Sequence, residues 1–381
     1  MKLNRYKFSE ITVNHDKKRI PLSAMERSKR QGEYRYFGAQ GVIDFVDDYL
    51  FNGKYLLIAE DGENLKSNKQ NIAQLVSGKF WVNNHAHIVT TNEKCRLEYL
   101  YYLINSTDLS GYITGSAQPK LSQGSMALIE LSIPEIEDQD RILSIVSLLD
   151  KRIHINTEIN KNLAEQSQAI LKKYMDSCDY TLMPLGELAE IIDCLHSKKP
   201  DSVNNTTKQL LQLNNITDSG FLDLSTKYYI SESDYENWTR KCEIVEGDCV
   251  ITNVGRIGAV SQAPAGTHAA MGRNMTCIRL KKDKPYHSYL ITVLLSNHIS
   301  KEIMRNTDEG TIMGALNVKN IPLLLFPVFS NETMCELEKT LHPIRNAIEY
   351  NYLANQTLGN LRDSLLPKLM SGNIDVSTIN I

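Results

Sequence analysis

Two long stretches of the chain place apolar residues at alternating steps of four and three. The first seam runs through Ile142, Val146, Leu149, Ile153, Asn156, Asn160, Leu163, Ser167, Ile170 and Tyr174, and the second through Leu337, Leu341, Ile344, Ile348, Asn351, Asn355, Leu358, Arg362, Leu365 and Leu369. Such a seam is typical of helices that pack by knobs-into-holes contacts. The pattern predicts long helices over 136–178 and 332–373, and a rod of about 38 residues at about 1.5 Å per residue is about 57 Å long.

The two helical stretches resemble one another. Residues 153–175 and 348–370 align without a gap at an offset of 195, with identities that include Ile153/Ile348, Asn156/Asn351, Asn160/Asn355 and Leu163/Leu358. Seven positions match in all, whereas average composition would give about one or two. Upstream, FSEI at 8–11 resembles LGEL at 185–188. We therefore predict an internal pseudo-twofold repeat, in which each half is a globular domain followed by a long helix.

Each seam contains two adjacent asparagine layers. A buried asparagine costs stability unless its amide finds a partner, so it penalises alignments that leave it unpaired. If the helices run antiparallel, Asn156 faces Asn355 and Asn160 faces Asn351, and we expect this register. Pro343 predicts a kink or a broken first turn in the second helix. The alternative, amphipathic helices on separate domain surfaces, stays open.

The rest of the chain forms two mixed segments. Strand patterns occur at 79–82, 86–90, 247–252 and 276–280, and helical patterns at 97–105 and 287–296. The expected fold class is α+β, with two mixed α/β domains, 1–135 and 179–331. Two long antiparallel coiled-coil helices separate them, and a tail follows at 374–381.

Composition narrows the possible environments. The 381 residues include 42 Lys and Arg against 45 Asp and Glu, and 42% are hydrophobic, enough to form real cores. The longest apolar stretch is the nine residues Ile321–Phe329, whereas a membrane helix needs about 20, so no membrane partner is expected. The N-terminus lacks the apolar core of a secretory signal. Seven cysteines without a CxxC pair indicate buried free thiols in the cytoplasm.

The motifs of several enzyme classes are missing. Gly53-Lys54 and Gly78-Lys79 are not followed by the Ser or Thr of a P-loop. The chain has no Pro-Pro dipeptide, which amino-group DNA methyltransferases carry, and Pro200-Asp201 is not followed by the acidic-x-Lys pattern of a nuclease. The chain is therefore expected to be non-catalytic.

His85 and His87 would share one face of a strand, but no third metal ligand stands out. We therefore favour polar contacts for both histidines over a metal site. Cys242 and Cys249 are expected to be small buried residues.

Several short strings resemble the DNA-specificity subunit of type I restriction–modification systems. They are Tyr36-Phe-Gly-Ala-Gln-Gly41, Leu57-Ile-Ala-Glu-Asp-Gly62, Trp81-Val-Asn-Asn-His-Ala-His87, Gln118-Pro-Lys-Leu-Ser122, Leu149-Asp-Lys-Arg-Ile153 and the segment 358–370. In this order, with the duplication, they cover nearly the whole chain. The resemblance implies that each domain reads one half of a split site in double-stranded DNA and that the helices set the spacing. It also implies that two methyltransferase subunits dock on the helices and that restriction and translocase subunits join them. S-adenosylmethionine would bind the methyltransferase, and no cofactor is expected in this chain.

Loop residues that look exposed are the candidates for DNA contact, because Lys and Arg suit phosphates and Asn, Gln and Arg suit base edges. They are Arg35, Tyr36, Lys66, Asn83, Asn84, His85, Gln118 and Lys120 in the first domain, and Lys198, Lys199, Asn253, Arg256, Arg273 and Asn274 in the second. We expect under half of them to touch DNA. The candidate spacer residues are Ile153, Asn156, Asn160, Leu163, Ile348, Asn351, Asn355 and Leu358.

Two other functions stay open at this point. The chain could be an orphan or exchangeable specificity subunit that acts with a methyltransferase only. It could also be a scaffold or adhesion protein whose coiled coil links two ligand-binding domains. The formal charge of −3 argues against an extended basic surface, although it does not exclude local basic faces.

Overall fold

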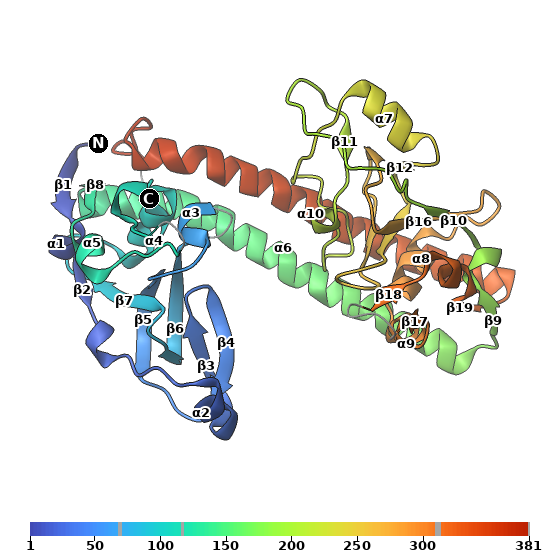
Figure 1. Cartoon of the computed structure of the whole chain (residues 1–381), viewed down its shortest axis with the longest axis horizontal. Coiled ribbons are helices and arrows are strands. Elements are labelled where there is room, and N and C mark those ends of the chain that lie inside the picture. The colour runs from blue at the N-terminus through green and yellow to red at the C-terminus, as the bar shows by residue number, and fades with distance from the viewer. Residues whose placement is uncertain (68–70, 116–117, 309–313, 380–381) are drawn as a thin grey trace. The chain divides into compact units, whose positions relative to one another are not determined.

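A computed structural model describes residues 1–67, 71–115, 118–308 and 314–379 (Figure 1). The chain divides into two units, Met1–Lys151 with Leu358–Ile381, and Arg152–Thr357. Each unit contains a globular domain and a part of each of the two long helices, α6 (Ile136–Ser177) and α10 (Asn331–Met370). The predicted fold class, two mixed domains with two long helices, is confirmed.

The first domain is built on a six-stranded sheet in the order β2-β7-β5-β6-β3-β4, in which only the β3–β6 pair is parallel. Its strands are β2 (Thr12–Asn14), β3 (Gln31–Gly38), β4 (Gly41–Val46), β5 (Phe51–Ala59), β6 (Ala73–Val82) and β7 (Ala86–Thr91). The short helices are α1 (Phe8–Ile11), α2 (Ala24–Lys29), α3 (Asn64–Ser67) and α5 (Gln123–Ala127). The longer α4 (Leu97–Ser106) buries Tyr99 and Leu100 in one core with Leu56 and Val89 of the sheet. The strands expected at 79–82 and 86–90 and the helix at 97–105 are therefore present.

The second domain has smaller sheets. A four-stranded sheet runs β10-β16-β13-β14, a three-stranded sheet runs β11-β15-β12, and β17 pairs with β18. The strands are β10 (Ala189–Asp193), β11 (Gln209–Leu210), β12 (Glu243–Val245), β13 (Cys249–Thr252), β14 (Val260–Gln262), β15 (His268–Ala270), β16 (Met275–Leu280), β17 (Thr307–Asp308) and β18 (Ala315–Leu316). The helices are α7 (Glu232–Thr239), α8 (His287–Leu294) and α9 (Asn297–Arg305). The predicted strands at 247–252 and 276–280 correspond to β13 and β16, and the predicted helix to α8.

The repeat is visible where each domain meets its long helix. In the first unit β1 (Leu3–Lys7) pairs antiparallel with β8 (Glu130–Pro134), which leads into α6. In the second unit β9 (Thr181–Pro184) pairs antiparallel with β19 (Leu325–Val328), which leads into α10. A short helical turn follows the first strand of each pair, at Phe8–Ile11 and at Leu185–Glu187. The similar strings that begin at Phe8 and at Leu185 therefore occupy equivalent places.

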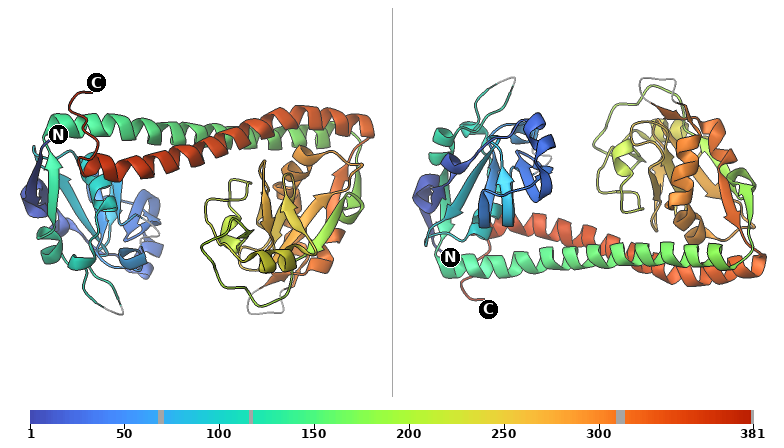
Figure 2. Two further views of the ribbon diagram at one scale, coloured as in Figure 1. Left: turned by 90° about the horizontal axis from the view of Figure 1, so that it is seen from above. Right: turned by 90° about the horizontal axis from the view of Figure 1, so that it is seen from below.

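Within each unit the segments of α6 and α10 lie side by side (Figure 2). Every seam residue is buried or half-buried. In the second unit the predicted asparagine pairs are present: Asn156 Nδ2 donates to Asn355 Oδ1 at 2.8 Å, and Asn351 Nδ2 donates to Asn160 Oδ1 at 2.9 Å. From the first pair to the second, the residue number rises by four on α6 and falls by four on α10, so the two helix segments run antiparallel.

Pro343 lies inside α10, which is helical without interruption from Asn331 to Met370. The broken turn expected there does not occur. Proline removes one backbone hydrogen bond, but the neighbouring Leu341 and Arg345 are 1% and 9% exposed. Packing on both sides of the proline therefore holds the helix together.

The cysteines are free, and five of the seven are buried. Cys242 and Cys249 are among these five, as predicted. The expectation of buried thiols is wrong for the other two, because Cys178 is half-buried at the end of α6 and Cys335 is exposed in the first turns of α10. Among the described residues, no helix is long and apolar enough to cross a membrane.

Alkylation of the native protein with iodoacetamide near pH 8 is expected to modify Cys335 first and Cys178 more slowly. Burial raises the pKa of the Cys95 and Cys249 thiols to about 12, and only the thiolate reacts. These two cysteines should react only after denaturation. Peptide mass spectrometry measures the order, and rapid native labelling of Cys249 would contradict the packing of β13.

Candidate nucleic-acid interface

A cavity of about 350 Å³ in the second domain brings together three of the predicted DNA-contact residues, Lys199, Arg273 and Asn274. Its other lining residues are Leu210, Gln212, Leu213, Asn214 and Trp238, so no described lining residue is acidic. Two cations and several amides therefore face one hollow. Arginine and lysine match phosphates or the O6 and N7 atoms of guanine, and asparagine and glutamine match adenine.

The shape of this cavity depends on two backbone segments, at Gly272 and Leu211, that lie very close to one another. Gly272 lies so near to Leu211 that a Cβ on it would meet the Leu211 carbonyl oxygen at 2.1 Å. Only glycine fits there, and it brings Arg273 and Asn274 beside the segment that begins at Gln212. Asn274 itself has a φ of 64°, the left-handed region that few residues other than glycine adopt. Such backbone conformations are concentrated at functional sites.

Hydrogen bonds within the segment 212–226 fix its conformation beside the cavity. Asn215 is fully buried, and its Nδ2 donates to the carbonyl oxygens of Asp223 at 2.6 Å and Thr226 at 2.9 Å. Lys199 Nζ lies 3.7 Å from the centre of the Tyr228 ring, which places its charge at the edge of the cavity. Gln212 and Asn214 were not among the predicted residues, because no sequence pattern distinguishes them from other loop amides.

The remaining candidates of the second domain lie elsewhere. Lys198 is exposed next to Lys199. Arg256 is also exposed, forms an ion pair with Asp218, and donates from Nη1 to the Ile216 carbonyl oxygen at 3.1 Å. It therefore braces a loop, although more than half of its side chain stays accessible.

In the first domain several candidates converge where loops meet the ends of β5 and β7. His85 Nδ1 contacts Asp61 Oδ2 at 2.7 Å, and Lys120 Nζ contacts Glu60 Oε1 at 3.2 Å. Lys66 Nζ donates to the Gly115 carbonyl oxygen at 3.0 Å. Asn84 and Gln118 are exposed in the same set of loops.

Arg35 is separate from this group. It lies half-buried on β3, where Nη2 donates to the Ser77 carbonyl oxygen at 2.6 Å and the guanidinium lies over the Phe37 ring. These contacts leave only part of Arg35 accessible to DNA.

Three of the candidate DNA-contact residues were expected to be exposed, but their side chains are buried. Tyr36 is 0% exposed, and its hydroxyl accepts a hydrogen bond from the Leu22 N–H. Asn83 accepts from the His85 N–H and thereby shapes the turn between β6 and β7. Asn253 donates to the Leu316 carbonyl oxygen and accepts from the Thr276 hydroxyl. Each of these polar groups is therefore hydrogen-bonded to other groups of the protein.

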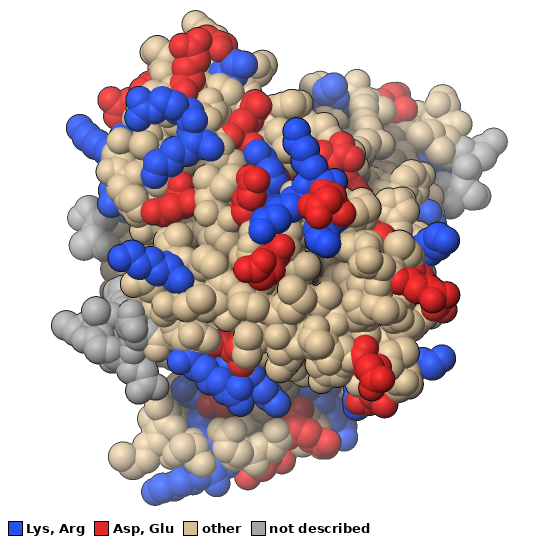
Figure 3. Space-filling model, turned by 90° about the vertical axis from the view of Figure 1, so that its right-hand side faces the viewer, with Lys and Arg blue, Asp and Glu red and all other residues tan. Residues whose placement is uncertain are grey.

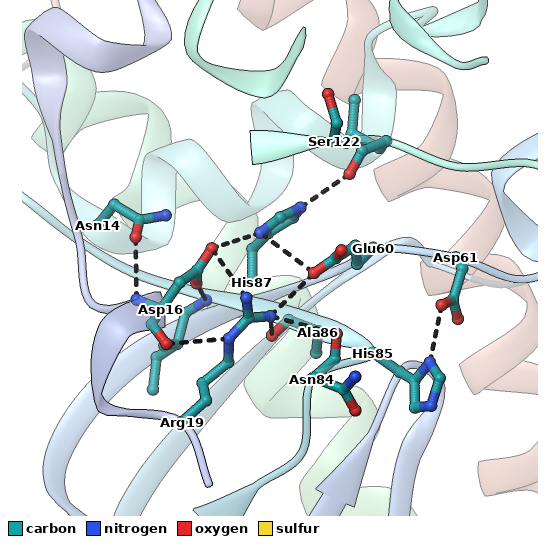
Figure 4. Close-up of polar contacts among 12 residues, drawn as sticks. Asn14, Asp16, Arg19, Glu60, Asp61, Asn84, His85, Ala86, His87 and Ser122 are labelled. Atoms are coloured by element: carbon teal, nitrogen blue, oxygen red, sulfur yellow. Dashed lines mark hydrogen bonds and ion pairs between the residues drawn. The ribbon is translucent and has the colours of Figure 1, made fainter. Parts of the chain in front are cut away.

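The two neighbouring histidines have different surroundings (Figure 4). His87 is 1% exposed, and its Nδ1 contacts Asp16 Oδ2 at 2.6 Å while its Nε2 contacts the Leu121 carbonyl oxygen at 2.8 Å. Both ring nitrogens are therefore occupied by protein partners. His85 is half exposed and contacts Asp61 instead. The polar-contact interpretation of this pair agrees with the structure.

Asp16 anchors the buried part of this network. Its Oδ1 accepts from the Ile88 N–H at 2.9 Å, and Arg19 lies 3.4 Å away and also reaches Glu60. Burial raises the pKa of the Asp16 carboxyl, but the hydrogen bonds from His87 and the Ile88 N–H outweigh it, so the pKa lies below its ordinary value. Sequence patterns did not single out Asp16 or Arg19.

Asp16→Asn is expected to destabilise the first domain at pH 7 by about 1.5–3 kcal/mol, the value of a hydrogen bond to a charged group. A carboxyl with a lowered folded-state pKa stabilises the protein above its unfolded pKa, near 4, and this contribution is lost as the pH falls further. The difference between wild type and variant should therefore shrink between pH 5 and pH 3. Urea denaturation at several pH values measures it. A pH-independent difference would rule out the ionic contribution.

Two groups of possible metal ligands occur among the described residues, both in the second domain. In the first, Cys242 and Cys277 lie beside Asp248, whose carboxylate oxygens accept hydrogen bonds from Arg279 at 2.8 and 2.6 Å. The arginine already neutralises this carboxylate. In the second, Asp193 and His196 are hydrogen-bonded at 2.8 Å beside the buried Cys194.

Charge is mixed on the face of the molecule drawn in Figure 3. On the face drawn in Figure 3, Lys and Arg side chains lie among Asp and Glu side chains, with neutral areas between them. This distribution agrees with the near balance of charges in the sequence.

Comparison with known proteins gives consistent matches. Residues 6–165 match the family model described as the type I restriction modification DNA specificity domain. The EcoprrI specificity subunit of Escherichia coli is 28% identical over 137 residues, which cover 36% of this chain and 33% of that protein. The HindI specificity subunit of Haemophilus influenzae is 31% identical over 135 residues, which cover 34% of this chain and 26% of that protein. The matched segment thus spans between about a quarter and a third of the length of these relatives.

A solved structure extends the fold similarity to the second half of the chain. The S subunit of a type I restriction–modification system from M. genitalium aligns with a TM-score of 0.57 and 13% identity, over 97% of this chain and 96% of that one. At this identity the likeness concerns the fold. The match of residues 6–165, the related subunits and the shared fold agree: over residues 6–165 this chain is similar to the type I restriction modification DNA specificity domain, and along its length it has the fold of a solved S subunit.

Proposed function

We propose that this chain is the sequence-recognition subunit of a type I restriction–modification complex. The domains over 1–135 and 179–331 would each read one half of a bipartite site in double-stranded DNA. The helices over 136–178 and 332–373 would set the spacing and dock two methyltransferase subunits, and the tail 374–381 would follow. Restriction and translocase subunits would complete a cytoplasmic assembly. The chain itself would be non-catalytic, with S-adenosylmethionine bound by the methyltransferase.

The observation that carries this proposal is the repeat. Each half has a strand pair, a short helical turn and a long helix in the same order, with a domain of different topology inserted between the paired strands. A shared scaffold with two different inserts suits two different recognition tasks. The cavity of Lys199, Arg273 and Asn274 supplies donors that could read base edges or hold phosphates.

The test is to co-express the full chain with the methyltransferase of its own operon and to map methylated bases in the host DNA. The proposal predicts one split motif with a constant spacing between its halves. Methylation with no common split motif would refute it. A restriction activity that requires further subunits distinguishes the full system from a methyltransferase-only system.

Arg273→Ala is expected to relax one base position of the second half-site and to weaken binding there by about 1–3 kcal/mol. The first half-site should be unchanged, because Arg273 lies in the second domain. Arg240→Ala is a matched control, since Arg240 is an exposed arginine of the same domain outside the cavity. Methylation rates on single-base variants of the site measure the effect. Equal weakening on all sequences, with a lower salt dependence, would instead identify a phosphate contact.

A further inference from the structure

Arg345 of α10 is a buried cation without an ion pair among the described residues. It is 9% exposed; its Nε donates to Gln262 Oε1 at 2.9 Å, and its Nη2 donates to the Gly220 carbonyl oxygen at 2.6 Å. The guanidinium also lies 3.5 Å from the centre of the Phe221 ring. Burial lowers the pKa of Arg345 to about 10, so it remains charged at neutral pH. A buried charge is costly, and this one is held by a loop on one side and a strand on the other.

Further residues on the same face of α10 continue these contacts. Glu349 Oε1 accepts from the Ala265 N–H at 2.6 Å, and the Tyr352 hydroxyl donates to the Leu222 carbonyl oxygen at 3.0 Å. The Tyr352 ring also stacks on Phe221 with 5.5 Å between the ring centroids. Gln356 Nε2 reaches Asp223 Oδ1 at 3.4 Å. From Arg345 to Gln356 this row spans about 16 Å of helix.

The segment held by this row is also the one that lines the cavity. Leu213 and Asn214 face the cavity at one end, and α10 holds residues 220–223 at the other. The two ends are locked together because the Asp223 N–H donates to the Asn215 carbonyl oxygen at 2.7 Å, in addition to the Asn215 side-chain bonds described above. A shift of residues 220–223 along the helix would therefore move the cavity wall.

The first half of the repeat has a contact at the equivalent position. At the offset of 195 residues, Asp150 of α6 corresponds to Arg345 of α10. Asp150 accepts a hydrogen bond from the Tyr102 hydroxyl of the first domain and pairs with Arg362 at 2.8 Å. In both halves, a charged side chain at this helix position holds the preceding domain. The residue types differ, as do the domains that they hold.

We propose that Arg345 and Tyr352 are positioning residues for base recognition, because they make the segment 212–223 a fixed extension of α10. The helix then determines where along the DNA the second half-site is read. This inference rests on the proposed function, and it adds that the spacing depends on the attachment of the domain to the helix as well as on helix length.

The experiment uses the full chain in complex with its methyltransferase and compares Arg345→Met, Arg345→Lys and Tyr352→Phe with wild type. Methylation is measured on DNA sites whose halves are separated by the natural spacing or by one base pair more or less. The Arg345 variants should raise relative methylation of the altered spacings by about tenfold, the factor for one lost hydrogen bond to a charged group, and Tyr352→Phe by about fivefold, the factor for a neutral one. The sequence preference at the first half-site should not change. Arg345→Lys keeps the charge but loses the planar fork, so it should behave like Arg345→Met.

Tyr350→Phe is the matched control, because Tyr350 is 71% exposed on the same helix and its hydroxyl loss should have no effect. Hydrogen exchange of the free chain gives an independent measurement: residues 212–223 should lose protection in Arg345→Met, whereas the β13–β16 pair should not. Variants that melt at lower temperature but keep one spacing and full protection of 212–223 would overturn the inference. Absence of any split motif with the wild-type complex would instead refute the proposed function, while the hydrogen-exchange result would still test the attachment.

Discussion

Asn156→Glu is expected to destabilise the second unit by about 3–5 kcal/mol, because it places an uncompensated charge in a buried helix seam. Asn156 is 1% exposed, and its Nδ2 donates to Asn355 Oδ1 at 2.8 Å. Asn355 in turn donates to the Ile153 carbonyl oxygen at 3.3 Å. A carboxylate at this position has no cation opposite it in the described structure and would repel the Asn355 oxygen. The helix pair should open around this layer.

Thermal unfolding measures the loss, and co-purification with the methyltransferase tests its consequence for assembly. His154→Glu is the control, since it introduces the same side chain two residues away at an exposed position of α6. The opposite change, Asn156→Leu, should preserve or raise stability, because Asn156 Oδ1 is buried without a hydrogen-bond partner among the described residues. It should also weaken the preference for one register. A glutamate variant as stable as wild type would contradict the buried antiparallel pairing.

Arg279→Met is expected to cost about 3–5 kcal/mol in the free energy of unfolding, the value for leaving one partner of a buried ion pair alone. Asp248 is 3% exposed and accepts two hydrogen bonds from Arg279, which also donates from Nη2 to the Glu243 carbonyl oxygen at 2.6 Å. These contacts join β16 to the turn between β12 and β13. Because β16 follows Arg273 and Asn274 directly, the same change should disturb the cavity.

A double-mutant cycle separates the pair from its surroundings. The variant Asp248→Asn/Arg279→Met removes both charges and should recover part of the stability lost in Arg279→Met. Urea denaturation at pH 7 measures all four proteins. If the double variant is less stable than wild type by the sum of the two single-variant losses, the two residues do not interact as the structure indicates.

The helices illustrate what could be predicted from the sequence. The heptad seam depends on a local period, and the duplication supplied a second copy with which to align it. The pairs of Asn156 with Asn355 and of Asn160 with Asn351 followed from those two facts, and the hydrogen bonds agree. The broken turn expected at Pro343 is absent because the local cost of proline is offset by buried neighbours, which sequence alone does not reveal.

The exposure of the candidate DNA-contact residues, in contrast, does not follow from local sequence patterns. Tyr36, Asn83 and Asn253 are polar residues beside turns, as are Asn84 and Asn274, yet the first three are buried and the last two exposed. A hydrogen-bonding side chain serves the backbone or the solvent according to which other segment covers it. That segment can be far away in sequence, as with Asn253 and Leu316.

The sequence by itself determined the two helices, their register, the repeat and the class of the domains, because these depend on periodic patterns and on a comparison of the chain with itself. Only the tertiary structure decided which of the candidate residues line one cavity. Lys199 and Arg273 are brought together by the close approach of Gly272 to Leu211, and the cavity wall is held on α10 by Arg345. These contacts join segments that share no sequence pattern. They stabilise the protein only after folding has brought the segments together.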